Sequence, residues 1–376
     1  MRRLVLLVSA VVLVDTMLYA ALTPLLPDYV ERFGLSKAGA GLLVSAYAVG
    51  ILGSALPAGL LAARLGPKLG VLAGLTLMAL SSLGYALADG PWSLGAARLA
   101  QGVGSALSWA GALAWLVGAT PRDRRGEMLG TALGAAVFGA LLGPALGASA
   151  SIVGDGVIFS AVAVLFAGLA FVALRMPAAP VESPSLPALV RLAREGAFLR
   201  ALWLVTLPAL LFGLVSILVP LELAAFGWGA IAIGAVFVAS AALEGALAPA
   251  VGRLADRRGT LLPVRITLAA AVGVSLGFAW ASQAPVVAAL VLAAGLAYGG
   301  LLAPGMTLIS TVAERGGLAQ AVAFGVMSAA WALGNAVGPA AGGALAAASG
   351  DTLPYLLAAA ACVATLALVS ATAPDR

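Results

Sequence analysis

The chain is divided into apolar runs that are long enough to cross a lipid bilayer as helices. A run of about 20 apolar residues spans the roughly 30 Å hydrocarbon core at 1.5 Å per residue. Twelve runs of this kind, separated by glycine, proline or charge, lie near residues 4–28, 38–63, 69–88, 92–118, 127–150, 155–175, 198–221, 228–251, 261–282, 285–311, 318–348 and 352–373. The sequence therefore predicts an all-α integral membrane protein with twelve transmembrane helices.

Composition supports this class and excludes several functions. The chain is 62% hydrophobic and 9% charged, whereas a soluble domain carries about 25% charged residues. It has no histidine, and its one cysteine, Cys362, lies in the last apolar run. These absences argue against a disulfide framework, a histidine-based metal site and a catalytic triad. We therefore expect no enzyme, no metal and no cofactor, with carboxylates as the only plausible proton carriers.

The distribution of positive charge predicts the orientation of the helices. With the N-terminus inside, only Arg32 and Lys37 lie outside, and Arg98 lies within the fourth run. The other 17 of the 20 Lys and Arg residues then fall in cytoplasmic segments, as the positive-inside rule requires. Both termini are thus predicted to be cytoplasmic. The cations are spread over short connections, a pattern that also argues against nucleic acid as a partner.

An internal repeat divides the chain into two halves. Three landmarks recur in the same order 193 to 195 residues later. Pro27 with Phe33-Gly34 corresponds to Pro220 with Phe226-Gly227, and the segment from Gly59 corresponds to the segment from Gly252. Gly143-Pro144 corresponds to Gly338-Pro339. Between the halves lies a Pro-rich, charged linker with a short predicted helix near 186–194. We expect two six-helix bundles, 1–175 and 198–376, joined by a cytoplasmic linker at 176–197, with a substrate cavity between them.

One acid stands in the middle of the first apolar run. Asp15 lies near the centre of residues 4–26, where a carboxylate costs roughly 2.5–3.5 kcal/mol on insertion scales. Acids inside membranes usually face a transport pathway, so we expect Asp15 to carry a proton or bind cargo. The alternative is a structural carboxylate that forms a hydrogen bond to a neighbouring helix.

Two short segments resemble a family signature. The sequence GLLAARLGPKLG follows the second run and GRLADRRG follows the eighth. Both resemble the G-x-x-x-D-R-x-G-R-K loop of the major facilitator superfamily, a likeness that extends over the whole chain. The resemblance implies cytoplasmic gating loops at Gly59, Arg64, Gly66, Gly252, Asp256, Arg257 and Gly259. The first copy departs from the family pattern, because Ala63 replaces the acid; the alternative is a pair of simple positive-inside turns.

The fourth run carries RLAQGVGSA, which resembles the family's second signature, R-x-x-Q-G-x-G. Helical spacing places four side chains on the same face of this helix: Arg98, Gln101, Ser105 and Trp109. In the family this arginine is linked to proton coupling, and a fixed cation helps a nearby carboxylate exchange its proton. The alternative is an interfacial arginine that extends toward water.

The fifth run contains a motif similar to the G-x-x-x-G-P-x-x-G signature of the family's antiporter branch. Its residues are Gly139, Gly143, Pro144 and Gly147, and a second copy includes Gly338 and Pro339. Small residues four apart allow two helices to approach closely, and proline introduces a kink. We expect a hinge or a packing face in each half.

The first run looks like the first helix of twelve-helix drug:proton antiporters, and is similar to those of tetracycline exporters and vesicular monoamine transporters. Asp15, Tyr19 and Thr23 are spaced four residues apart, so we expect them to line the substrate cavity together. Other candidates for the cavity are Tyr298, Trp331 and Asn335. Two more acids, Glu222 and Glu244, are assigned to proton coupling with Asp15 and Arg98, although Glu222 also fits a wetted boundary residue.

Together these features predict a proton-coupled antiporter that exports hydrophobic, cationic or zwitterionic small molecules by alternating access. Three membrane acids against one arginine favour cationic cargo. The expected partners are the substrate, protons and the lipid bilayer, with the chain acting as a monomer in a bacterial inner membrane. The alternatives are an importer or facilitator of a metabolite with the same fold, and a non-transporting receptor or scaffold.

Overall fold

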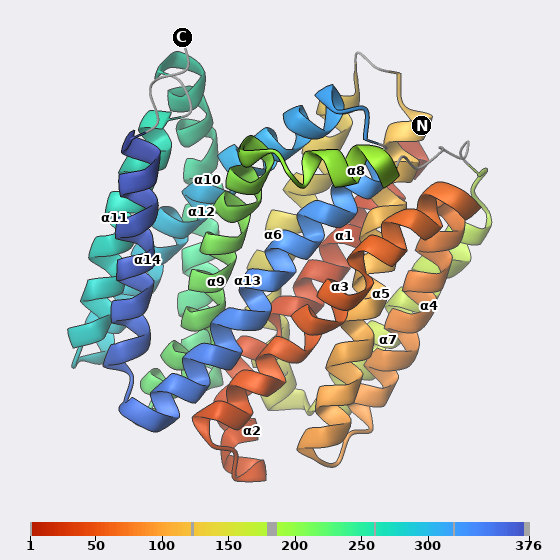
Figure 1. The fold of residues 1–376 in the computed structure, drawn as a ribbon. Helices are drawn as coiled ribbons and strands as arrows, with labels where there is room; N and C mark the ends of the chain where they lie inside the picture. The colour runs from red at the N-terminus through yellow and green to blue at the C-terminus, as the bar shows by residue number, and fades with distance from the viewer. Residues whose placement is uncertain (1, 122–123, 179–185, 259–260, 319, 372–376) are drawn as a thin grey trace.

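The computed structural model describes residues 2–121, 124–178, 186–258, 261–318 and 320–371 (Figure 1). Within these ranges the chain forms the helices α1 (Arg2–Ala20), α2 (Leu22–Phe33), α3 (Lys37–Leu65), α4 (Pro67–Ala86), α5 (Pro91–Ala119), α6 (Arg125–Val153), α7 (Asp155–Leu174), α8 (Leu186–Leu192), α9 (Gly196–Ala225), α10 (Ala230–Arg258), α11 (Leu261–Trp280), α12 (Ala284–Arg315), α13 (Gln320–Ser349) and α14 (Thr352–Ala371). The start of α1 and the end of α14 lie at the same end of the bundle (Figure 1). We call it the predicted cytoplasmic end and the opposite one the predicted outer end.

Twelve helical segments in the described residues are long and apolar enough to cross a membrane. Their order follows the apolar runs of the sequence, so the prediction of an all-α protein with twelve spans is confirmed. The short helix expected after the proline cluster is also present, as α8.

The first span consists of two helices, α1 and α2, that meet at Ala21. The backbone keeps helical angles there (φ −65°, ψ −25°). Three residues later, Pro24 has no N–H group and cannot donate a hydrogen bond to the carbonyl of Ala20. The helix is therefore interrupted in its hydrogen bonding at the carbonyl of Ala20, about one and a half turns beyond Asp15.

The connections at the predicted cytoplasmic end are shorter than the motif suggested. Helix α3 continues through Gly59 and Arg64 to Leu65, and the turn into α4 is made at Gly66, whose φ of 96° suits glycine. In the second copy α10 continues through Gly252, Asp256 and Arg257. Gly66 thus lies in a turn as predicted, but the prediction that the preceding residues of each segment form loops is wrong, because their leucine, alanine and arginine residues favour helix. A gating role for these segments stays a prediction. The side chains of the second copy and all of Gly259 lie outside the described residues.

Glycines of the predicted hinge motifs lie where two helices touch. A Cβ atom at Gly139, Gly143 or Gly147 of α6 would meet the backbone or side chains of the first span, at Leu13, Met17, Ala20, Ala21 and Pro24. In the second half, Gly338 of α13 meets the Leu210 carbonyl of α9 in the same way. These glycines therefore serve helix packing in both halves, as small residues do in membranes.

Two helix crossings between the halves have the same construction. Gly41 of α3 lies against the carbonyl of Pro339 in α13, and Gly234 of α10 lies against the carbonyl of Pro144 in α6. The two glycines are 193 residues apart and the two prolines 195, which is the offset of the sequence repeat. The crossings are thus equivalent contacts of a duplicated unit.

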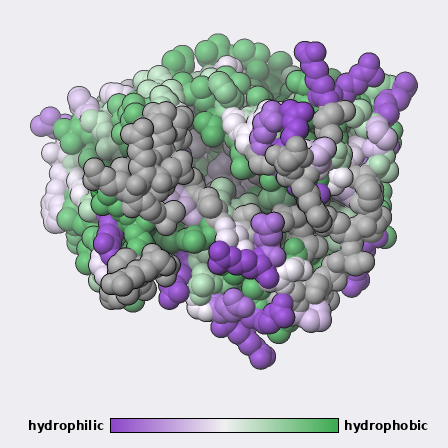
Figure 2. Space-filling view, turned by 90° about the horizontal axis from the view of Figure 1, so that it is seen from above, coloured by the Kyte–Doolittle hydropathy of each residue, from purple (hydrophilic) through white to green (hydrophobic). Residues whose placement is uncertain are grey.

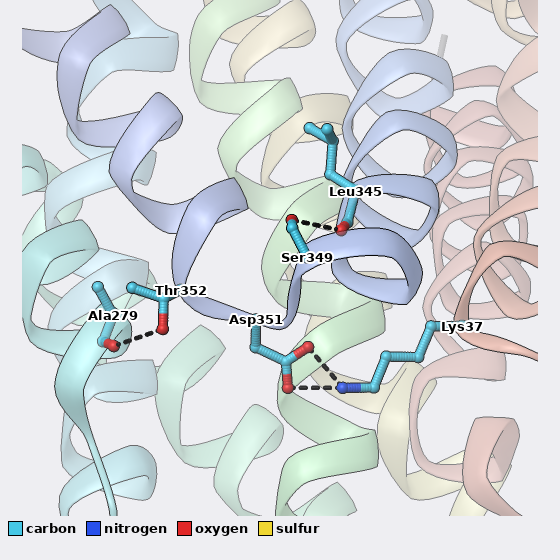
Figure 3. Close-up of polar contacts among 6 residues, drawn as sticks. All are labelled: Lys37, Ala279, Leu345, Ser349, Asp351 and Thr352. Atoms are coloured by element: carbon cyan, nitrogen blue, oxygen red, sulfur yellow. Dashed lines mark hydrogen bonds and ion pairs between the residues drawn. The ribbon is translucent and has the colours of Figure 1, made fainter.

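An ion pair reinforces the α3–α13 contact at the predicted outer end. Lys37 begins α3, and its Nζ lies 2.5 and 2.6 Å from the two carboxylate oxygens of Asp351, in the turn between α13 and α14 (Figure 3). The carbonyl of Lys37 also lies against Gly343. The two halves are therefore closed against each other on this side of the outer end.

Gly41→Ala tests the first crossing. The added Cβ would overlap the Pro339 carbonyl, and we expect the overpacking to lower the free energy of unfolding by about 1–3 kcal/mol. Gly53→Ala, on the same helix, is the matched control, since a Cβ there meets nothing within 4 Å. Thermal denaturation of the purified protein in detergent measures both; equal melting temperatures would contradict the close crossing.

Candidate functional site

Asp15 lies at the centre of a polar cluster inside the first half. Its side chain is 2% exposed and accepts hydrogen bonds from three residues on two helices. Tyr47 Oη of α3 donates to Oδ1 at 2.8 Å, Ser105 Oγ of α5 donates to Oδ2 at 2.8 Å, and Trp109 Nε1 of α5 donates to Oδ2. In the described part of the chain, no Lys or Arg nitrogen lies within 4.0 Å of this carboxylate. The donors are therefore neutral, and the carboxylate has no directly paired cation.

Arg98 is buried next to the interruption of the first span. Its side chain is 2% exposed. Nη1 donates to the carbonyl of Leu18 at 3.3 Å and Nη2 to that of Tyr19 at 3.3 Å, while Gln101 Oε1 accepts from Nη1 at 3.4 Å. The alternative that Arg98 extends toward water is therefore wrong, because its guanidinium binds helix-end carbonyls instead.

Tyr47 connects the arginine to the acid. Its ring lies 4.7 Å from the Arg98 guanidinium carbon, while its hydroxyl donates to Asp15. A cation over a tyrosine face is attracted by the ring quadrupole. Sequence reasoning missed Tyr47; the available signal was one tyrosine in the middle of the otherwise apolar second run.

Aromatic and amide side chains continue the cluster into the second half. Tyr19 Oη donates to Asn335 Oδ1 of α13 at 2.7 Å. The Tyr19 ring lies 5.0 Å from Trp331 and 5.2 Å from Tyr47. Tyr19, Trp109 and Trp331 are only half-buried, whereas Asn335 is 3% exposed. The structure thus brings together eight of the predicted residues: Asp15, Tyr19, Arg98, Gln101, Ser105, Trp109, Trp331 and Asn335.

Two other predicted cavity residues lie elsewhere. Tyr298 is buried between helices of the second half, where its hydroxyl lies 3.1 Å from Ser275 Oγ and its ring packs edge-on against Phe212. Thr23 is half-buried in the first turn of α2. Among the described hydrogen bonds, none joins either residue to the Asp15 cluster.

The two additional acids are also separate from Asp15. Glu244 of α10 is half-buried, and its carboxylate lies against Gly299 of α12, where no Cβ would fit. Glu222 lies near the outer end of α9, within electrostatic reach of Lys37 and Asp351. No described contact joins them to the cluster, so their part in proton coupling stays a prediction.

Two buried nitrogens in the cluster have no hydrogen-bond partner in the structure: Arg98 Nε and Gln101 Nε2. Buried donors normally find an acceptor in the protein, in water or in a ligand. Viewed from the predicted cytoplasmic end, the surface is hollowed near its centre, with hydrophilic side chains at the rim (Figure 2). A carboxylate, spare donors and aromatic faces together suit binding of a polar organic molecule. The described residues contain no group of acids and cysteines arranged to hold a metal.

Comparison with known proteins agrees with this architecture. The family model for the Major Facilitator Superfamily matches residues 8–324. The human organic anion transporter MFSD10 (TETRAN) is similar in structure, with a TM-score of 0.75, 20% identity and coverage of 98% of this chain and 99% of that one. A variant of the nucleoside transporter NupG is also similar, with a TM-score of 0.77, 15% identity and coverage of 98% of this chain and 99% of that one. No curated protein matches the sequence. At these identities the two structures establish the fold alone.

A double-mutant cycle tests the bond between Tyr47 and Asp15. We expect Tyr47→Phe and Asp15→Ala to be non-additive by at least about 1 kcal/mol, because each removes the same buried hydrogen bond, the first its donor and the second its acceptor. Tyr85→Phe is the control, since Tyr85 donates to Tyr29 and not to Asp15. Denaturant titration measures the free energy of unfolding of each variant. Additive effects of the Tyr47 and Asp15 substitutions would contradict the assigned bond.

Proposed function

The chain belongs to the major facilitator superfamily and is a membrane transporter, and we propose that it is a proton-coupled antiporter that exports hydrophobic cationic or zwitterionic small molecules. The single observation that carries this proposal is the buried Asp15 carboxylate, which is held by neutral donors beside aromatic faces. Such a carboxylate can be neutralised by a proton or by a cationic ligand, because no cation of the described chain occupies it.

The surroundings of Asp15 favour a positively charged ligand. Trp109 donates to the acid, and the rings of Tyr19 and Trp331 pack against each other in the same cluster. All three side chains are half-buried, and aromatic faces attract organic cations. The membrane-embedded acids Asp15, Glu222 and Glu244 outnumber Arg98. A net negative interior attracts cations and disfavours anions.

Competition for Asp15 supplies the coupling. A proton taken up from outside releases the cargo, and cargo taken up from inside displaces the proton. Arg98 remains charged throughout and acts on Asp15 through the Tyr47 ring and hydroxyl. One proton moving down about 100 mV provides roughly 2.3 kcal/mol, which corresponds to a ten- to hundredfold gradient of cargo.

Alternating access requires contacts between the halves that can open. The Lys37–Asp351 ion pair and the Gly41–Pro339 crossing close the predicted outer end. At the centre the Tyr19–Asn335 hydrogen bond joins α1 to α13. Opening toward the outside would break these contacts, including the hydrogen bond between Tyr19 and Asn335, and would connect the Asp15 cluster with the side on which the cargo is released.

Export by proteoliposomes tests the role of Asp15. With an imposed proton gradient, we expect the wild-type protein to drive uphill movement of the fluorescent cation ethidium, and Asp15→Asn to abolish it because the amide cannot exchange a proton. Asp89→Asn, an exposed acid with the same change of charge, should transport normally. Uphill transport by Asp15→Asn at the wild-type rate would refute the coupling scheme. Uptake that persists after a protonophore is added would favour the importer alternative.

A charge exchange tests the outer closure. Lys37→Glu should slow transport several-fold, because two carboxylates then face each other where an ion pair stood. Combining Lys37→Glu with Asp351→Lys should restore much of the rate. The measurement is the initial rate in the same vesicles, and a double variant no better than Lys37→Glu would show that the pair has no role in the cycle.

A further inference from the structure

A second cavity lies in the first half, away from the Asp15 cluster. It has a volume of about 370 Å³ and opens at the predicted outer end between α2, the α4–α5 turn and the α6–α7 turn. Its polar lining consists of Asp28, Tyr29, Arg32, Tyr85, Ser151 and Asp155. No step of the transport scheme uses it.

The cavity presents both signs of charge with free bonding capacity. Arg32 Nη1 lies 3.9 Å from Asp155, which is an ion pair but too long for a hydrogen bond. Among the described hydrogen bonds, none involves the guanidinium of Arg32 or the carboxylate of Asp28. Arg32 can therefore donate to an anion, and Asp28, one turn earlier on α2, can accept from a cation in the same cavity.

Two buried tyrosines form the floor of the cavity. Tyr85 Oη donates to Tyr29 Oη at 3.1 Å, and both tyrosines are 2% exposed. Asp155 lies close to Tyr29 and forms its ion pair with Arg32. The acids and the arginine of the lining therefore lie above a rigid aromatic floor.

Large exposed apolar side chains neighbour the lining residues Ala88, Leu94 and Ser151 in the sequence. Leu87 is 75% exposed and Trp92 is 89% exposed on the α4–α5 side, and Ile152 is 70% exposed at the end of α6. In a membrane protein such side chains contact lipid, and tryptophan marks the level of the headgroups. A ligand at this position therefore meets charged groups inside and hydrocarbon around the mouth.

We propose that this cavity binds the headgroup of a phospholipid that carries a primary ammonium group. The ammonium group lies between Asp28 and Asp155, and the phosphate is bound by Arg32, whose planar guanidinium suits phosphate oxygens. The acyl chains lie along the exposed apolar side chains at the mouth. This binding is independent of the proposed transport reaction.

Native mass spectrometry of the full-length protein in detergent tests the proposal. Phosphatidylethanolamine and phosphatidylglycerol with identical acyl chains are titrated separately. We expect the first molecule of phosphatidylethanolamine that binds to have a lower dissociation constant than the first molecule of phosphatidylglycerol. Asp28→Asn and Arg32→Gln should each weaken it about tenfold, the usual size of a lost charge-assisted contact. Asp89→Asn, an exposed acid near the same end and outside the cavity lining, should bind as the wild-type protein does.

A third variant blocks the cavity without removing a charge. It tests the site independently of the possibility that loss of a charged residue misfolds the protein. Ser151→Phe fills the exposed edge of the cavity and should also weaken phosphatidylethanolamine binding. Gel filtration identifies variants that remain folded. Unchanged binding in folded Asp28→Asn, Arg32→Gln and Ser151→Phe would overturn the site. Soluble phosphoethanolamine binding as tightly as the lipid would overturn the phospholipid as its occupant.

Discussion

The hydrogen bonds to Asp15 are the interaction on which the rest of the structure depends. A carboxylate in the hydrocarbon region needs compensation, and here the compensation comes from Tyr47, Ser105 and Trp109 on two neighbouring helices. The helices α1, α3 and α5 must therefore stay in register around a single side chain. Arg98 belongs to the same arrangement but is bound to the carbonyls of Leu18 and Tyr19. Within the described residues the acid is consequently left without a salt bridge.

The same packing solution occurs in each half of the chain. Glycines of α6 lie on the first span, and glycines of α13 lie on α9; the proline beside them then meets a glycine of the opposite half. One motif thus organises both the interior of a bundle and its contact with the other bundle. The functional polar groups do not follow this symmetry, because the cluster around Asp15 has no counterpart among the predicted residues of the second half. Duplication accounts for the framework, and divergence of single side chains accounts for the site.

Much of the framework was predictable because it depends on local sequence. Length and hydropathy identify the twelve spans, and helical spacing places Arg98, Gln101, Ser105 and Trp109 on one face. Contacts between helices that are distant in the sequence are harder to predict. Tyr47, the Tyr19–Asn335 bond and the Lys37–Asp351 pair depend on how uniformly apolar helices are oriented against one another, and the sequence pattern does not specify that orientation. At Gly59 and Gly252 the family resemblance predicts loops, whereas the helix-favouring residues around these glycines continue α3 and α10.

The crossing between Gly41 and Pro339 has a consequence for the energetics of motion. Two backbones meet there, and neither glycine nor proline has a flexible side chain to immobilise. Ordering a long side chain on contact costs up to about 2 kcal/mol of conformational entropy, whereas glycine and proline side chains cost almost nothing. Closing this surface therefore freezes few rotamers, and opening it releases few. Rotamer entropy at this crossing therefore contributes little to the free energy difference between closed and open arrangements, and polar contacts between the halves, such as Lys37–Asp351 and Tyr19–Asn335, contribute relatively more.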